Sequence, residues 1–140
     1  MKVKLKKLNE NVKLPVYAKT GDAGLDIKAT RIESENNYSI TYGTDLCIEI
    51  PFGYVGLIFP RSSIRNYDLV LSNCVGVVDS GYRGEIMATF KKTKLDGMYY
   101  DVDDKVMQII ILPYPSIEFE FTDELSETER GEGGFGHTGK

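Results

Sequence analysis

The chain has 140 residues, with 21 acidic and 17 basic side chains and a net charge of -4. This length is enough for one domain with its own hydrophobic core. The acidic balance argues against nonspecific nucleic-acid binding through a basic face. The longest apolar run, residues 109–112, is far too short to cross a membrane. The lysine-rich N-terminus lacks the apolar stretch of a signal peptide, so a soluble, cytoplasmic protein is expected.

Short apolar segments separated by turn residues predict β-strands in the first half of the chain. Residues 3–5 and 23–29 alternate apolar and polar side chains, which is the period of a half-buried strand. Residues 46–50 and 54–59 predict two more strands, whereas residues 31–45 are polar and rich in turn formers. Asp26 falls on the polar side of its strand, where it is either solvated or part of the ligand shell of a metal.

No segment shows a sustained helical period, but a single helical turn is expected from Pro60 to about Tyr67. Proline ends the preceding strand, and the hydroxyls of Ser62 and Ser63 can cap a turn. Free amides, two hydroxyls and the guanidinium of Arg61 would together form an anion site. A plain capped turn with a surface arginine is the simpler alternative.

Residues 73–85 hold an amide, a carboxylate, an aromatic ring and three glycines between two apolar-rich segments. A hairpin bent at residues 80–81 would bring together Asn73, Asp79 and Tyr82, because glycine adopts turn geometries that other residues resist. Such a cluster could hold and process a small planar ligand. An ordinary hairpin with a solvated aspartate is the alternative.

The second half of the chain predicts two further strands. Residues 106–113 are almost wholly apolar but contain Gln108, whose amide is either satisfied in the core or directed at a site. Residues 117–121 alternate isoleucine and phenylalanine with glutamate, which predicts one more strand. Many short strands with Gly, Pro, Asn and Asp between them indicate an all-β sandwich or barrel.

Cys47 and Cys74 have no metal-ligand spacing and lie in strand-like sequence. They are expected to be two buried thiols in a reducing compartment, with a disulfide as the less favoured alternative.

Residues 130–140 combine an arginine, a threonine, one aromatic ring and five glycines. Spacings here match a dinucleotide fingerprint and most of a Walker A loop. Both motifs need a following helix, which is not expected in a chain that stops at Lys140. Ordering each residue costs roughly 1–2 kcal/mol of backbone entropy, which bonds to a highly charged ligand could offset. A lid over a phosphate-bearing ligand is therefore expected, and a disordered terminus is the alternative.

Five motifs occur in a fixed order along the chain. They are Ala-Gly-Leu-Asp-Ile-Lys-Ala at 23–29, Pro-Arg-Ser-Ser-Ile at 60–64, Gly-Val-Val-Asp-Ser-Gly-Tyr-Arg-Gly-Glu at 76–85, Asp-Lys-Val-Met-Gln at 104–108, and the glycine-rich tail. This ordered set spans nearly the whole chain and resembles the trimeric, all-β dUTP pyrophosphatase (dUTPase) family. No single motif is decisive, but the set is highly specific.

The resemblance implies an all-β, jelly-roll-like barrel or sandwich with a flexible glycine-rich C-terminal arm. Residues 1–121 would form the β domain, and residues 122–140 an acidic linker and a lid over the active site of a neighbouring subunit. A homotrimer would carry three sites at its subunit interfaces and use Mg²⁺. The implied reaction is hydrolysis of dUTP to dUMP and pyrophosphate, which limits uracil incorporation into DNA and supplies dUMP for thymidylate synthesis.

The resemblance also implies a role for each motif residue. Asp79 would be the general base for water attack on the α-phosphorus, and Asp26 would hold waters on Mg²⁺. Tyr82 would pack on the deoxyribose and crowd out a 2′-hydroxyl. The residues that contact uracil and deoxyribose would be Asn73, Gly76, Val78, Tyr82 and Phe135. The residues that contact the phosphates would be Arg61, Ser62, Ser63, Gln108, Arg130, Gly136, His137 and Thr138.

The second motif departs from the family pattern at one position, which raises dCTP deaminase, a relative with the same fold, as an alternative. The family usually has glycine where this chain has Ser63, and Arg-Ser-Ser-Ile-Arg at 61–65 also resembles dCTP deaminase. The catalytic glutamate of that relative aligns with Thr89, which cannot transfer protons as a carboxylate does. A dUTP-responsive regulatory module that binds a protein partner is the alternative from another functional class.

Overall fold

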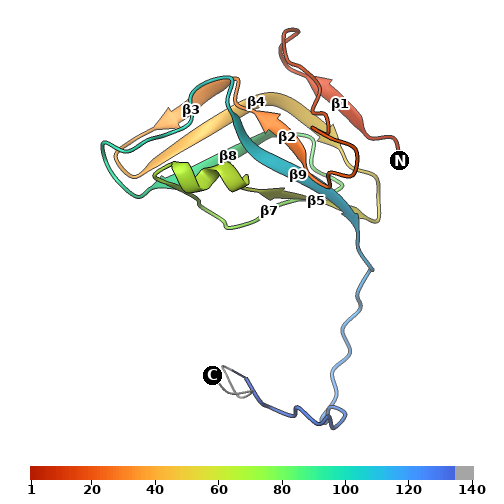
Figure 1. Cartoon of the computed structure of the whole chain (residues 1–140). Coiled ribbons are helices and arrows are strands. Elements are labelled where there is room, and N and C mark those ends of the chain that lie inside the picture. Colours follow the sequence, from red (N-terminus) through yellow and green to blue (C-terminus); the bar gives the residue numbers. More distant parts are fainter. Residues whose placement is uncertain (135–140) are drawn as a thin grey trace.

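In the computed structural model, which describes residues 1–134, the chain forms two antiparallel β-sheets stacked as a sandwich (Figure 1). The elements in chain order are β1 (Lys4–Lys7), β2 (Leu25–Lys28), β3 (Arg31–Glu35), β4 (Ser39–Glu49), β5 (Tyr54–Phe59), the 3₁₀ helix η1 (Ser62–Asn66), β6 (Leu69–Leu71), β7 (Gly76–Val78), β8 (Glu85–Lys92) and β9 (Lys105–Pro113). Among residues 1–134, no helix has the length and apolarity that a membrane crossing requires.

The two sheets divide the strands by pairing rather than by chain order. One sheet has the order β1-β4-β8-β6, with β3 also paired to β4, and the other has the order β2-β9-β5-β7. Both sheets contribute apolar side chains to one core, in which Tyr42, Phe90 and Tyr100 meet edge to face. The Tyr42 hydroxyl is satisfied there, because it donates to the carbonyl of Tyr100 at 2.8 Å. The expected all-β, jelly-roll-like class is confirmed.

The most regular sequence patterns gave correct strands. The strands predicted at residues 23–29, 54–59 and 106–113 correspond to β2, β5 and β9. The expectation that residues 31–45 lack strand signals was wrong, because β3 and the first half of β4 lie there. β3 is an edge strand whose side chains are largely exposed, so its sequence is polar.

The hairpin expected about residues 80–81 forms only in part. The flanking segments β6 and β8 pair antiparallel, with Leu71 opposite Phe90, but residues 76–78 leave that sheet and form β7 in the other one. β7 pairs with β5, whereas β8 pairs with β4 and β6. Gly76 faces Ile58 across the β5–β7 pair, and a Cβ at residue 76 would lie 3.1 Å from the Cβ of Ile58. Residues 73–85 therefore carry the chain from the sheet of β6 to the sheet of β7 and back again to β8.

The helical turn after Pro60 is present, but the serines do not cap it. Arg61 occupies the N-cap position, and no side chain caps the turn. The turn is closed by backbone bonds from Ile64 N–H to the Arg61 carbonyl and from Tyr67 N–H to the Ile64 carbonyl, at 3.0 and 2.9 Å.

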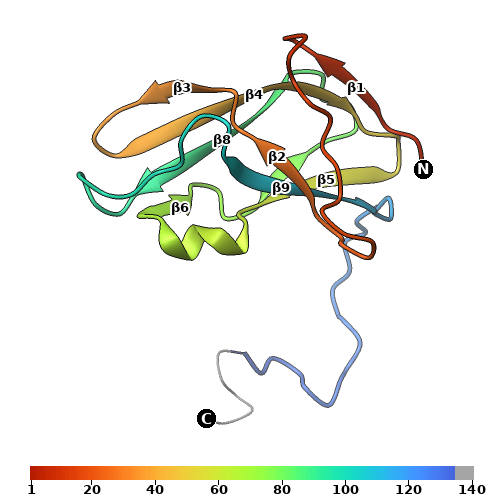
Figure 2. The same cartoon turned by 45° about the horizontal axis from the view of Figure 1, so that its top comes forward.

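The strand predicted at residues 117–121 is absent. The chain leaves the sandwich after β9 and runs away from it in both views (Figures 1 and 2). The side chains of Ile117 and Phe119 are 69% and 92% exposed, so the apolar alternation is not buried within the described chain. A strand needs a partner for its backbone groups, and the described part of this chain supplies none at this position.

Both cysteines are free thiols, so the alternative of a disulfide is wrong. The expectation that both are buried is also wrong: Cys47 is partly buried and Cys74 is exposed, in a left-handed turn with φ of 61°.

Candidate active site

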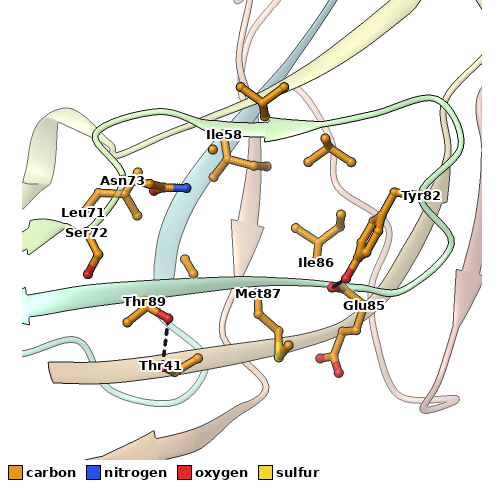
Figure 3. A pocket seen from close by; sticks show the side chains of 14 residues that line it. Thr41, Ile58, Leu71, Ser72, Asn73, Tyr82, Glu85, Ile86, Met87 and Thr89 are labelled. Atoms are coloured by element: carbon orange, nitrogen blue, oxygen red, sulfur yellow. Dashed lines mark hydrogen bonds between the residues drawn. The ribbon is translucent and has the colours of Figure 1, made fainter.

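A cavity of about 450 Å³ lies between residues 73–85 and β8 (Figure 3). Asn73 and Tyr82 lie at opposite ends of it, and Ile58 and Ile86 lie between them. Small-molecule sites typically have volumes of about 300–1,000 Å³ with apolar walls and a few polar groups. The residues predicted for base and sugar binding that line this cavity are Asn73, Gly76, Val78 and Tyr82.

The turn that carries Asn73 is tightly closed. Cys74 N–H donates to the Leu71 carbonyl at 3.1 Å, and Val75 N–H donates to the Asn73 carbonyl at 2.6 Å. A Cβ at residue 76 would lie 3.4 Å from Nδ2 of Asn73. That distance is an ordinary van der Waals contact, so Ile58, at 3.1 Å, constrains residue 76 more tightly than the Asn73 amide does.

Tyr82 is held by its own hydroxyl. Its Oη donates to the backbone carbonyl of Glu85 at 2.9 Å. A Cβ at residue 84 would overlap that hydroxyl, so Gly84 allows the ring to lie close to the backbone. Asp79 begins the turn that Tyr82 closes, through a 3.1 Å bond from Tyr82 N–H to the Asp79 carbonyl, and its side chain is exposed beside the cavity residue Val78.

A second group of predicted residues gathers where β2 and β9 meet the end of β5. Nε of Arg61 donates to Oδ1 of Asp26 at 2.6 Å, and Nη2 donates to Oδ2 at 3.2 Å. Lys105 Nζ lies 2.8 Å from the same Oδ2. Asp26 and Gln108 are cross-strand partners, and Gln108 donates to the Pro60 carbonyl at 3.0 Å. The Gln108 side chain therefore holds the segment that precedes η1 against β9.

The Asp26 carboxylate accepts hydrogen bonds from both cations, Arg61 and Lys105. Partial burial alone would raise its pKa, but hydrogen bonds from Lys105 and Arg61 hold the pKa below its usual value. Arg61 also donates to the Ser63 hydroxyl at 3.3 Å, so the serine that replaces the usual glycine has a partner. Ser62 is exposed at the start of η1.

The residues available for a metal ion are few. Among residues 1–134, no three His, Cys, Asp or Glu side chains gather as a metal site. Both oxygens of Asp26 already accept bonds from Arg61 and Lys105. This donor set fits an ion that keeps its waters and takes its direct ligands from a bound polyphosphate, as Mg²⁺ commonly does.

The two groups do not share a cavity. The walls of the 450 Å³ cavity include none of Asp26, Arg61, Ser62, Ser63 or Gln108. Arg130 bonds to the Gly133 carbonyl at 2.9 Å within the C-terminal arm. The remaining predicted contacts lie outside the described residues: Phe135, Gly136, His137 and Thr138.

Sequence reasoning gave no role to Lys105, Arg31 or Glu85. Lys105 lies within the fourth motif, and a cation three residues before Gln108 is a signal that was available there. Arg31 and Glu85 are 54 residues apart and meet only in the fold.

A family model described as dUTPase matches residues 10–139. The chain belongs to the dUTPase family. Its relatives include the deoxyuridine 5'-triphosphate nucleotidohydrolase of Acinetobacter baumannii strain AYE, at 38% identity over 100% of this chain and 99% of the relative. That of Alcanivorax borkumensis is 34% identical over 96% of this chain and 93% of the relative.

Solved structures of the dUTPase family share the fold. A dUTPase variant of Staphylococcus bacteriophage 80alpha with dUpNHpp superposes with a TM-score of 0.85 at 26% identity, and the match covers 99% of each chain. A variant of the phage phi11 dUTPase has a TM-score of 0.76 at 24% identity over 89% of this chain and 98% of that one. The family match therefore spans all five ordered motifs, and the solved structures share the sandwich.

Replacing Asp26 by asparagine is expected to lower the free energy of unfolding at pH 7 by about 1–3 kcal/mol, because two cations lose a charged acceptor. The folded-state pKa of Asp26 is lowered from 3.8. Its stabilising contribution is therefore complete above that value and is lost as the pH falls through the folded-state pKa. Urea unfolding at pH 7 and pH 3 should show a smaller difference from the wild type at pH 3. Asp96→Asn, at an exposed turn, is the control; an equal difference at both pH values for Asp26→Asn would contradict this account.

Proposed function

We propose that the chain hydrolyses dUTP to dUMP and pyrophosphate, as expected for a dUTPase. The observation that carries this proposal is the cavity between Asn73 and Tyr82, formed by the motif that the family model matches. Two findings support it. Relatives at 34–38% identity are named as deoxyuridine 5'-triphosphate nucleotidohydrolases, and the bacteriophage 80alpha dUTPase with the same fold was solved with dUpNHpp.

The cavity suits a pyrimidine nucleoside. An asparagine amide presents both a donor and an acceptor, which matches the alternating groups on the uracil edge. Uracil would lie against Ile58 and Ile86 with its edge towards Asn73, and the sugar would pack on Tyr82. A ring held at that position would leave no room for a 2′-hydroxyl, and the base site would leave none for a thymine methyl.

Asp79 would act as the general base. Asp79 is exposed and begins the turn that Tyr82 closes, and from there its carboxylate would orient a water for attack on the α-phosphorus. The new oxygen–phosphorus bond forms as the bond to the departing pyrophosphate breaks, and Asp79 accepts the proton of the water. General base catalysis of this kind contributes roughly 10²–10⁴-fold.

The second group would bind the triphosphate. The Arg61 guanidinium is already oriented by Asp26 and bonds to Ser63, and Gln108 bonds to the neighbouring Pro60 carbonyl. Ser62 is exposed at the start of η1 beside them. Mg²⁺ would neutralise charge on the phosphate oxygens and would contact Asp26 only through water. A phage phi11 dUTPase is described as coordinating a structural Mg(II) ion.

A homotrimer would complete the site. The base-binding cavity and the cationic corner lie apart on one described chain, so one chain would supply the nucleoside contacts and another the phosphate contacts. Residues 122–140 would form the linker and lid over a neighbouring site. The lid contacts would be Arg130, Phe135, Gly136, His137 and Thr138. The proposed role of the enzyme is to limit uracil incorporation into DNA and to supply dUMP, in the cytoplasm.

Purified protein with Mg²⁺ is expected to release pyrophosphate from dUTP far faster than from dTTP, dCTP or UTP.

In Asp79→Asn, kcat should fall by about 10²–10⁴-fold, while a non-hydrolysable dUTP analogue still binds. Asp96→Asn serves as the matched control. Comparable rates on all four nucleotides would defeat the proposed specificity, and full activity of Asp79→Asn would remove Asp79 as the base.

Deleting residues 131–140 is expected to reduce kcat/KM for dUTP by roughly 10²-fold, because the triphosphate is then held less accurately for attack. Light scattering should show that the assembly is intact. A variant in which a Gly/Ser segment of equal length replaces residues 131–140 separates loss of specific contacts from loss of chain length. Unchanged kinetics in both variants would refute the lid.

A further inference from the structure

Arg31, on β3, lies among three carboxylates contributed by three strands. Its Nη1 lies 2.7 Å from Oδ1 of Asp45. The guanidinium also forms a two-pronged pair with Glu85, with Nη1 to Oε1 at 2.8 Å and Nη2 to Oε2 at 2.7 Å. Glu33 accepts from Nε at 2.8 Å on the exposed side. Paired, charge-assisted bonds of this geometry are stronger and more directional than single ion pairs.

The Glu85 carboxylate is bound from both sides. Besides Arg31, its Oε1 accepts the backbone N–H groups of Thr44 and Asp45 at 2.8 and 2.7 Å. These two residues form the irregularity at which the β4–β8 register shifts between Gly43 and Cys47. Asp45 is held there with a φ of 54°. The Glu85 side chain is only 12% exposed, and its hydrogen bonds to Arg31 lower the pKa of its carboxyl.

Glu85 also connects this charged cluster to the cavity. Its backbone carbonyl accepts the Tyr82 hydroxyl at 2.9 Å, and Tyr82 forms one end of the cavity. Figure 3 shows the Tyr82 ring reaching down to Glu85 at the start of β8. A displacement of Glu85 would therefore move the acceptor that orients the aromatic ring.

We propose that Arg31 is a positioning residue for substrate selection: by fixing Glu85 it holds Tyr82 in the orientation that excludes a ribonucleotide sugar. This inference rests on the proposed function, in which Tyr82 packs on the deoxyribose. Lysine cannot replace Arg31 in this role, because one ammonium group cannot satisfy both oxygens of Glu85 and the Asp45 carboxylate in the same geometry.

The test compares Arg31→Lys with Glu33→Gln, which removes only the exposed partner of the same guanidinium. In Arg31→Lys the ratio of kcat/KM for UTP to that for dUTP should rise about tenfold, the order expected for one lost hydrogen bond. The loss for dUTP should lie mainly in KM. Hydrogen exchange should become faster in residues 79–85, while Glu33→Gln matches the wild type in both measurements.

A double-mutant cycle with Tyr82→Phe shows whether Arg31 acts through the tyrosine hydroxyl. If it does, Arg31→Lys will not change the UTP/dUTP ratio any further in the Tyr82→Phe background. Lower thermal stability with an unchanged ratio and unchanged exchange at residues 79–85 would overturn the inference, because Arg31 would then only stabilise the β4 irregularity. If the wild type does not hydrolyse dUTP, the proposed function fails, and hydrogen exchange alone decides whether Arg31 positions residues 79–85.

Discussion

The passage of the chain between the two sheets at residues 73–85 is the constraint on which the rest of the structure depends. β7 satisfies its backbone through β5, whereas β8 satisfies its own through β4 and β6. The two strands therefore cannot close on each other as a hairpin, and a cavity remains between them. The cavity has Asn73 at one end and Tyr82 at the other because tight turns at both ends of β7 carry these two residues.

Charge pairs orient the functional groups before any ligand binds. Asp26 fixes the guanidinium of Arg61 near the end of β5, and Arg31 fixes Glu85, whose carbonyl accepts the Tyr82 hydroxyl. The chain has a net charge of -4, so local cations would be needed to offset its repulsion of an anionic triphosphate. A preorganised arginine loses less freedom when phosphate arrives, which is how electrostatic stabilisation of a transition state becomes effective. In the proposed function, the two pairs would therefore act at the two ends of the substrate.

The sequence predicted the fold class better than the spatial arrangement of the proposed site residues. β5 and β9 could be predicted because their apolar patterns are continuous, whereas β3 is polar at a sheet edge and gave no signal. Local pattern predicted a hairpin bent at residues 80–81, and β6 and β8 do pair about that point. Nothing in the segment indicates that residues 76–78 pair with β5 instead. The contact of Arg31 with Glu85 joins residues 54 positions apart, so no local spacing could indicate it. The division of the motif residues into two groups likewise appears only in three dimensions.

The most direct test is a crystal structure of the assembled protein with Mg²⁺ and a non-hydrolysable dUTP analogue. The account predicts uracil between Ile58 and Ile86 with its edge at Asn73, and the deoxyribose on Tyr82. It also predicts that Asp79 of one subunit and Arg61 of another approach the same α-phosphate. A nucleotide whose base lies outside the cavity, or whose α-phosphorus lies beyond the reach of every Asp79 in the assembly, would contradict the account.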